Sequence, residues 1–188
     1  GSILTFTMAQ EAVVVEPYEQ GTIVIEQDFD TSPIELRTDA RVEPLGEQKF
    51  RNIVRQAYDY SCGSAALTTV LNFYLGRNLG ERQVMEGLLH YGESERIVQR
   101  RAFSMLDMKR LVTALGYPSG GFRATIDDLI DLDHPAIVPI QHAGFKHFVV
   151  LRTIRDGRVY LADPAVGNIS FTLAQFEESW DDNVLFIV

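Results

Sequence analysis

The sequence predicts an α+β fold, in which helices come first and a mostly antiparallel sheet follows. Apolar residues recur at helical spacing from Ser61 to Gly116, whereas β-branched runs dominate from Pro135 onward. Asp156-Gly157 separates two of these runs, and this dipeptide is typical of a tight hairpin turn. Hydrophobic residues make up 46% of the 188 residues, so the chain can bury a sizeable core.

Cap and turn residues delimit the expected elements. Ser104 and Thr125 mark helix starts, and Gly76 and Gly116 mark helix ends. Helices are therefore expected at residues 61–76, 81–89, 104–116, from 125 onward, and 173–180. Strands are expected at residues 135–141, 147–153, 158–162, 169–171 and 184–188.

The N-terminal part of the chain differs in pattern, so an arm of residues 1–50 is expected beside a domain of residues 51–188. Residues 13–15 and 22–25 are β-branched runs that predict short strands, and the Asp-, Pro- and Gly-containing stretches after them predict turns. The apolar stretch Ile3–Ala9 is consistent either with the tail of a trimmed signal peptide or with an ordinary edge strand.

Composition and charge exclude several classes of function. The net charge of −9 argues against binding to nucleic acid, whose phosphates require basic contacts, and against docking on an anionic membrane. No apolar run reaches the roughly 18 residues that a membrane-spanning helix needs, and no glycine-rich phosphate loop occurs. The single cysteine, Cys62, is either a small buried apolar residue or a reactive thiol.

The position of Cys62 favours the reactive thiol. A thiol is a strong nucleophile only as thiolate, which the N–H groups of a helix start and a nearby imidazole both favour. Asp59-Tyr60-Ser61 offers cap residues for a helix that begins around Cys62. Gly63, the next residue, would leave room for a substrate backbone to approach.

His147 is the best candidate for the base that accepts the thiol proton. It opens the apolar run Phe148–Leu151, so a buried strand would hold it in a fixed position. His142 is the weaker candidate because it lies beside the flexible Ala143-Gly144. The other two histidines are expected at the surface: His90 and His134.

Two further side chains complete the predicted site. Asp163 ends the strand after the hairpin, which would bring it within reach of His147 and let it orient the imidazole. The alternative is a turn-forming Asp before Pro164. Gln56 lies six residues before Cys62, and its amide could donate to the oxyanion together with the backbone N–H of Cys62.

In this order the motifs resemble the double-glycine leader peptidases, papain-like enzymes usually found as the N-terminal domain of bacteriocin-exporting ABC transporters. The resemblance covers residues 53–188, including a segment similar to that family's third helix at residues 104–117. It implies a helical lobe packed on an antiparallel sheet lobe, with the active site in the cleft between them. The motifs that carry it are Gln56, Cys62-Gly63-Ser64-Ala65-Ala66-Leu67, His147-Phe148-Val149-Val150-Leu151 and Asp163-Pro164-Ala165-x-Gly167.

The resemblance also implies residue roles and a substrate. Cys62 would be the nucleophile, His147 the general base and acid, Asp163 the orienting residue and Gln56 the oxyanion donor, with no metal or cofactor. The substrate would be a protein or peptide cut after a Gly-Gly motif.

The chain departs from the family pattern, because it carries no transporter and has the extra arm. It is therefore similar to the stand-alone peptidases of bacterial functional-amyloid (Fap) export systems, which implies a periplasmic location. A cytoplasmic location is the alternative. Secretion-system components are the implied partners, besides the substrate itself.

Two other functions stay open on the sequence alone. One is a peptidase-like domain that binds a secretion substrate without cutting it, and the joint presence of all four site residues argues against this. The other is a different Cys-His-Asp enzyme, such as a transglutaminase-like or amidase domain. The spacing of Gln56 and the apolar run after His147 favour a peptidase over that alternative.

Overall fold

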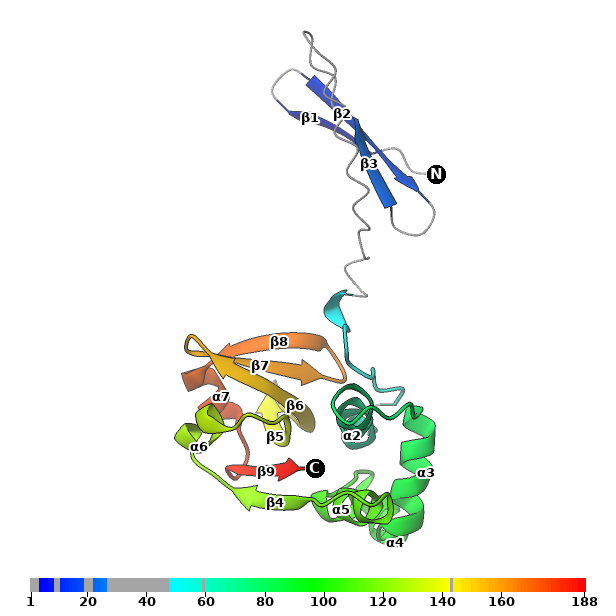
Figure 1. Ribbon diagram of the computed structural model, residues 1–188, viewed down its shortest axis with the longest axis vertical. Coiled ribbons are helices and arrows are strands. Elements are labelled where there is room, and N and C mark those ends of the chain that lie inside the picture. Colours follow the sequence, from blue (N-terminus) through cyan, green and yellow to red (C-terminus); the bar gives the residue numbers. More distant parts are fainter. Residues whose placement is uncertain (1–3, 9–10, 19–21, 27–47, 59, 143) are drawn as a thin grey trace. The chain divides into compact units, whose positions relative to one another are not determined.

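The computed structural model describes residues 4–8, 11–18, 22–26, 48–58, 60–142 and 144–188 (Figure 1). The chain divides into two compact units, Gly1–Gln48 and Lys49–Val188. In the first unit, three antiparallel strands form a sheet in chain order: β1 (Leu4–Met8), β2 (Glu11–Tyr18) and β3 (Thr22–Glu26).

The strands of the first unit confirm the β-branched runs as strand signals. β2 and β3 contain the two predicted runs, and β1 is the edge strand that was one of two expectations for residues 3–9. The turns predicted between β3 and residue 48 fall on positions 27–47, which lie outside the described residues.

The second unit confirms the α+β prediction. Four helices come first: α2 (Cys62–Phe73), α3 (Glu81–Tyr91), α4 (Ser94–Arg100) and α5 (Met105–Ala114). Two shorter helices, α6 (Ile126–Asp131) and α7 (Leu173–Ser179), lie between strands in the chain order. The sheet is antiparallel in the order β4-β9-β5-β6-β7-β8, where the strands are β4 (Gly120–Arg123), β5 (Ala136–His142), β6 (Phe145–Arg155), β7 (Arg158–Asp163), β8 (Gly167–Thr172) and β9 (Val184–Ile187).

Two elements were not predicted, α4 and β4. In α4 only Ile97 is buried, so the helix lacks the apolar stripe by which a sequence reveals an amphipathic helix. β4 begins with two glycines and pairs only with β9, at the edge of the sheet. Glycine has low strand propensity, so pairing with a neighbour rather than local preference places β4 in the sheet.

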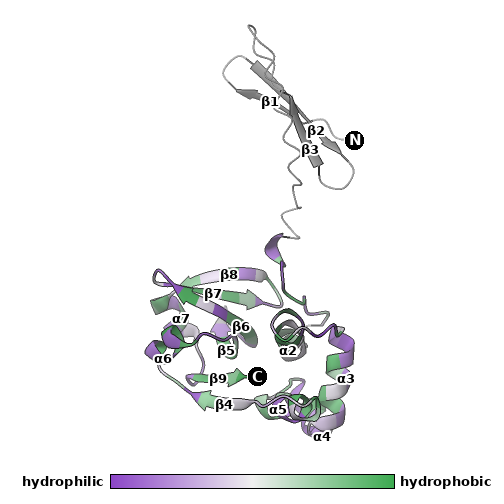
Figure 2. Ribbon diagram, in the orientation of Figure 1, coloured by the Kyte–Doolittle hydropathy of each residue, from purple (hydrophilic) through white to green (hydrophobic). Residues whose placement is uncertain are grey.

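Both faces of the sheet are covered by helices (Figure 1). One core cluster joins α2, α3 and α5 to Ile137 and Val150, and a second joins α6 and α7 to Val138 and Val149. Successive residues of a strand thus serve opposite layers, as the strand repeat requires. Hydrophobic colouring along α2 and β9 contrasts with the hydrophilic colouring of α4 and α6 (Figure 2).

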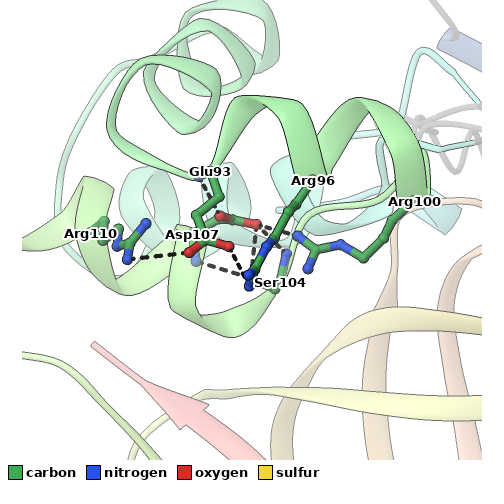
Figure 3. Close-up of polar contacts among 6 residues, drawn as sticks. All are labelled: Glu93, Arg96, Arg100, Ser104, Asp107 and Arg110. Carbon is green, nitrogen blue, oxygen red and sulfur yellow. Dashed lines mark hydrogen bonds and ion pairs between the residues drawn. The ribbon is translucent and has the colours of Figure 1, made fainter.

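A buried carboxylate, Asp107, joins three neighbouring segments of the helical part (Figure 3). Its Oδ1 accepts a hydrogen bond from the backbone N–H of Glu93 at 3.0 Å. Its Oδ2 accepts from the backbone N–H and the hydroxyl of Ser104, each at 2.8 Å, and from Arg100 at 3.2 Å. The Ser104 hydroxyl in turn accepts from the Asp107 N–H, which completes a capping box at the start of α5.

Replacing Asp107 with Ala should therefore lower the free energy of unfolding by about 3 kcal/mol, because two partly buried N–H groups lose their acceptor. The matched control is Asp133→Ala, since Asp133 is exposed and its ion pair is with the exposed His134. The control should change stability by less than about 0.5 kcal/mol. Urea denaturation measures both, and equal midpoints for the two variants would contradict this role of Asp107.

Candidate active site

His147 and Asp163 form a close side-chain pair between adjacent strands. His147 Nε2 lies 2.7 Å from Asp163 Oδ2, and their side chains are only 17% and 2% exposed. An ionised carboxylate can only accept hydrogen bonds, so Nε2 carries the proton of this bond. Nδ1 is then the nitrogen left to act on another group.

A β-bulge in β6 puts these two side chains on the same face of the sheet. The hairpin turn pairs Arg155 with Arg158, and an unbroken register from there would set Asp163 opposite Val150. His147 and Asp163 would then point to opposite faces, because the side-chain period of a strand is two.

The register shifts by one residue between Leu151 and Thr153, where Arg152 is the additional residue. After the shift Val150 pairs with Ala162, so the same register sets Asp163 opposite Val149 and two residues from His147 on a shared face. Such diagonal neighbours are within reach of long side chains.

The surroundings of Asp163 keep it ionised. Burial alone would raise the pKa of this carboxyl group, but the hydrogen bond and the charge of His147 hold the pKa below its ordinary value. The backbone N–H groups of Ala165 and Val166 act in the same direction, because both donate to Oδ1, at 2.8 and 3.3 Å. Asp163 therefore shapes the turn before the next strand and also holds the imidazole.

Cys62 is the first residue of α2, as predicted. Ser61 stands at the N-cap, but its hydroxyl donates to the carbonyl of Tyr58 at 3.0 Å instead of capping the helix. The first turn of α2 contains no acidic side chain, and Asp59 lies outside the described residues. The N–H groups at this helix start thus stay available to a negative charge at the site.

The pKa of the Cys62 thiol is raised, against the expectation of an activated, low-pKa thiol. Burial is the largest cause. The backbone N–H groups of Phe148, Gly63 and Cys62 itself lower the pKa, as a helix start predicts, while the charge of Asp163 raises it. Burial outweighs the N–H groups, so the thiolate needs a neighbouring base that takes its proton.

The same contacts place the thiol beside strand β6. The Phe148 N–H that acts on Cys62 belongs to the residue directly after His147. Between these described residues no hydrogen bond joins the thiol to the imidazole itself. Such catalytic hydrogen bonds are often long without substrate, so this geometry is compatible with a thiol–imidazole pair.

Gly63 has a different role from the one expected for it. A Cβ atom at this position would lie 3.1 Å from Met108 Cε, 3.3 Å from Phe103 Cβ and 3.4 Å from Phe148 Cδ2. The space is therefore filled by the protein's own side chains rather than kept for a substrate backbone. Gly63 lets the start of α2 pack closely against the segment before α5 and against β6.

Gln56 lies in a segment without helix or strand, residues 51–57, which we call the strap. Its backbone N–H donates to the carbonyl of Pro164 at 3.0 Å, directly beyond Asp163. Its side-chain Nε2 donates to the carbonyl of Tyr58 at 2.9 Å, while the buried Oε1 has no partner. A primary amide has two N–H hydrogens, so one hydrogen of Gln56 is still available for an oxyanion.

Further residues hold the strap in place, and the sequence analysis missed them. Thr69 of α2 accepts the N–H of Val54, and Glu81 of α3 accepts the N–H of Ala57. Arg152, the bulge residue, donates to the carbonyls of Arg51 and Asn52. Each partner lies 15 or more residues from the strap residue that it holds, so no local pattern could reveal these bonds.

The remaining histidines lie elsewhere or outside the description. His90 and His134 are exposed, as predicted, and the side chain of His142 lies outside the described residues. Within the described ranges, no cluster of three His, Cys, Asp or Glu side chains is arranged to hold a metal ion. No helix in those ranges is long and apolar enough to cross a bilayer.

Comparison with known proteins relates this geometry to one family. A family model described as the peptidase C39 family matches residues 51–188. The "probable functional amyloid protease FapD" of Pseudomonas aeruginosa is 39% identical over 148 residues, which cover 79% of this chain and 65% of that protein. Its namesake from Pseudomonas fluorescens is 34% identical with the same coverage. The chain thus spans 65% of the length of these curated relatives.

Solved structures show the same fold. A double-glycine motif protease from an AMS/PCAT transporter, solved in complex with the leader peptide, has a TM-score of 0.59 at 24% identity. The match covers 72% of this chain and 88% of that one. The peptidase domain of Streptococcus ComA, a bi-functional ABC transporter, has a TM-score of 0.58 at 20% identity, covering 72% and 95%.

The raised pKa of Cys62 leads to a test of the thiol and its base. Wild-type protein should be alkylated by iodoacetamide at pH 6–7 faster than the His147→Ala variant, since His147 takes the thiol proton. In His147→Ala the buried thiol must ionise unaided, so the rate should rise only above that pH. His142→Ala is the control and should behave as wild type. Equal pH profiles for wild type and His147→Ala would contradict the pairing.

Proposed function

Because the chain belongs to the peptidase C39 family, we propose that it is an endopeptidase in which Cys62 attacks and His147 carries the proton. The fold is papain-like and the chain is a cysteine peptidase by family, as the sequence predicted. In this proposal Asp163 orients the imidazole, and Gln56 donates to the oxyanion.

One observation carries the proposal, the 2.7 Å bond between His147 Nε2 and Asp163 Oδ2. The partner of His147 is a carboxylate that is 2% exposed and also accepts two backbone N–H groups. An ordinary surface histidine is not held by such a buried, fixed group. The pair fixes the ring, leaves Nδ1 as the working nitrogen and stabilises the imidazolium form. A domain that only binds peptide would gain nothing from this arrangement.

The first half-reaction forms a thioester. The Cys62 proton passes to Nδ1 of His147 as Sγ attacks the substrate carbonyl carbon, and the carbonyl electron pair moves to oxygen. That oxygen accepts hydrogen bonds from the free amide hydrogen of Gln56 and from the backbone N–H of Cys62. The carbon–nitrogen bond then breaks, and the leaving amine takes the proton from His147.

The second half-reaction releases the acid product. A water molecule gives a proton to His147 and attacks the thioester carbon, and the same donors stabilise the second oxyanion. The carbon–sulfur bond breaks and the thiolate recovers the proton from His147. Cys62 and His147 are then back in their starting protonation states, so the cycle needs no cofactor.

The proposed substrate is an exported protein cut after Gly-Gly. The support is the family match, together with relatives whose names describe a functional amyloid protease and a double-glycine motif protease. We assign the reaction to the bacterial periplasm and expect components of a secretion or functional-amyloid export system as partners. The acidic net charge of −9 fits a protein substrate better than a nucleic acid.

A pair of peptides tests this specificity. Selection for Gly-Gly would act by exclusion, because a Cβ atom on either residue would collide with a narrow site. A peptide with Gly-Gly after apolar residues should be cut behind the second glycine, and changing either glycine to Val should stop cleavage. Product masses give the cut position.

Cys62→Ala protein is the control and should leave both peptides intact. A peptide with Gly-Gly but without the upstream apolar residues should be cut poorly, since remote contacts position the chain for attack. Efficient cleavage of the Val-substituted peptide would instead indicate a cysteine peptidase of another specificity.

A further inference from the structure

Glu81 joins the two chain segments that would supply the oxyanion donors. It is the first residue of α3, and its Oε2 accepts the backbone N–H of Ala57 at 3.0 Å. Its Oε1 lies 3.3 Å from the hydroxyl of Ser64. Ala57 directly follows Gln56, and Ser64 lies two residues after Cys62.

We propose that Glu81 is a positioning residue that sets the spacing between the Gln56 amide and the Cys62 backbone N–H. The inference rests on the proposed peptidase function, because it concerns where a carbonyl oxygen would be bound between these donors. Oxyanion donors act through fixed geometry, and a displacement of about 1 Å can cost up to about 10²-fold in rate. A single side chain that spans both segments is well suited to fix that geometry.

Other bonds do not replace Glu81. Thr69 and the carbonyl of Pro164 hold the strap before and at Gln56. After Gln56 the described bonds of the loop are local, since Tyr58 and Ser61 bond to each other. In the described part of this loop, Glu81 is thus the one side chain from another element that holds the chain between Gln56 and Cys62.

Position, rather than charge, is what Glu81 contributes. A negative charge near the start of α2 opposes the Cys62 thiolate, so the charge itself gives no catalytic benefit. The Ser64 hydroxyl lies closer to the carbonyl of Ser61, at 2.8 Å, than to Glu81, so the bond to Ala57 is the stronger tie. An uncharged glutamine at position 81 can accept the same N–H.

Four variants separate position from charge: Glu81→Ala, Glu81→Asp, Glu81→Gln and, as the matched control, Glu86→Ala. Glu86 lies on the same helix but is exposed, and its ion pair is with the exposed Arg82. With a Gly-Gly peptide, Glu81→Ala and Glu81→Asp should lower kcat by about tenfold or more while KM changes little. Glu81→Gln and the control should stay near wild type.

Two further readouts distinguish positioning from general damage. Alkylation of Cys62 by iodoacetamide needs no oxyanion donor, so its rate should not fall in any of the variants. In a Gln56→Ala background, Glu81→Asp should cost nothing more, because the donor that it positions is gone. Glu81→Asp keeps the negative charge at the start of α3, so this variant can carry the test if Glu81→Ala fails to fold.

The inference is overturned if Glu81→Asp matches the control, if its loss is undiminished in the Gln56→Ala background, or if alkylation falls in parallel with kcat. A wild type that cuts no peptide would end the proposed function, yet Glu81 can still be judged by NMR. Glu81→Asp should shift the side-chain amide signals of Gln56, and Glu81→Gln should not. Unshifted Gln56 signals in Glu81→Asp would then overturn the positioning role.

Discussion

The single-residue bulge at Arg152 is the constraint on which the site depends. The Asp156-Gly157 turn, with positive φ at both residues, sets a hairpin register that would separate His147 from Asp163. One additional residue in β6 moves the side chains between His147 and the bulge to the opposite face of the sheet. His147 and Asp163 then share a face, which allows the 2.7 Å bond. The same residue holds the carbonyls of Arg51 and Asn52, so the bulge also anchors the strap that carries Gln56.

Cys62 and Asp163 have pKa shifts in opposite directions. Cys62 and Asp163 both lose water, but Asp163 receives three hydrogen bonds and keeps its pKa low, whereas burial raises the pKa of the thiol. The negative charge therefore lies on Asp163 in the resting protein, and in the proposed mechanism the thiolate arises when His147 accepts the thiol proton. Reactivity then depends on the relative positions of α2 and β6 more than on the helix start alone.

The sequence predicted the features that local patterns carry. The helix that begins at Cys62, the hairpin at Asp156-Gly157 and the long apolar strand after His147 all follow from residue spacing and turn chemistry. The bulge, the role of Gly63 and the contact of Glu81 with Ala57 could not be predicted, because each depends on atoms far apart in the sequence. The predicted direction of the Cys62 pKa shift was wrong for the same reason, since burial is a property of the packed molecule.

The protonation of His147 tests the central claim most directly, because the bond to Asp163 requires the hydrogen on Nε2. Nitrogen NMR of protein labelled at histidine distinguishes the two ring nitrogens and needs no substrate. The account predicts that the neutral ring of His147 carries its hydrogen on Nε2 and that Nδ1 bears none. Asp163→Asn should disturb this preference. A neutral ring with its hydrogen on Nδ1 would contradict the account, because His147 could then neither bond to Asp163 as described nor accept the proton of Cys62.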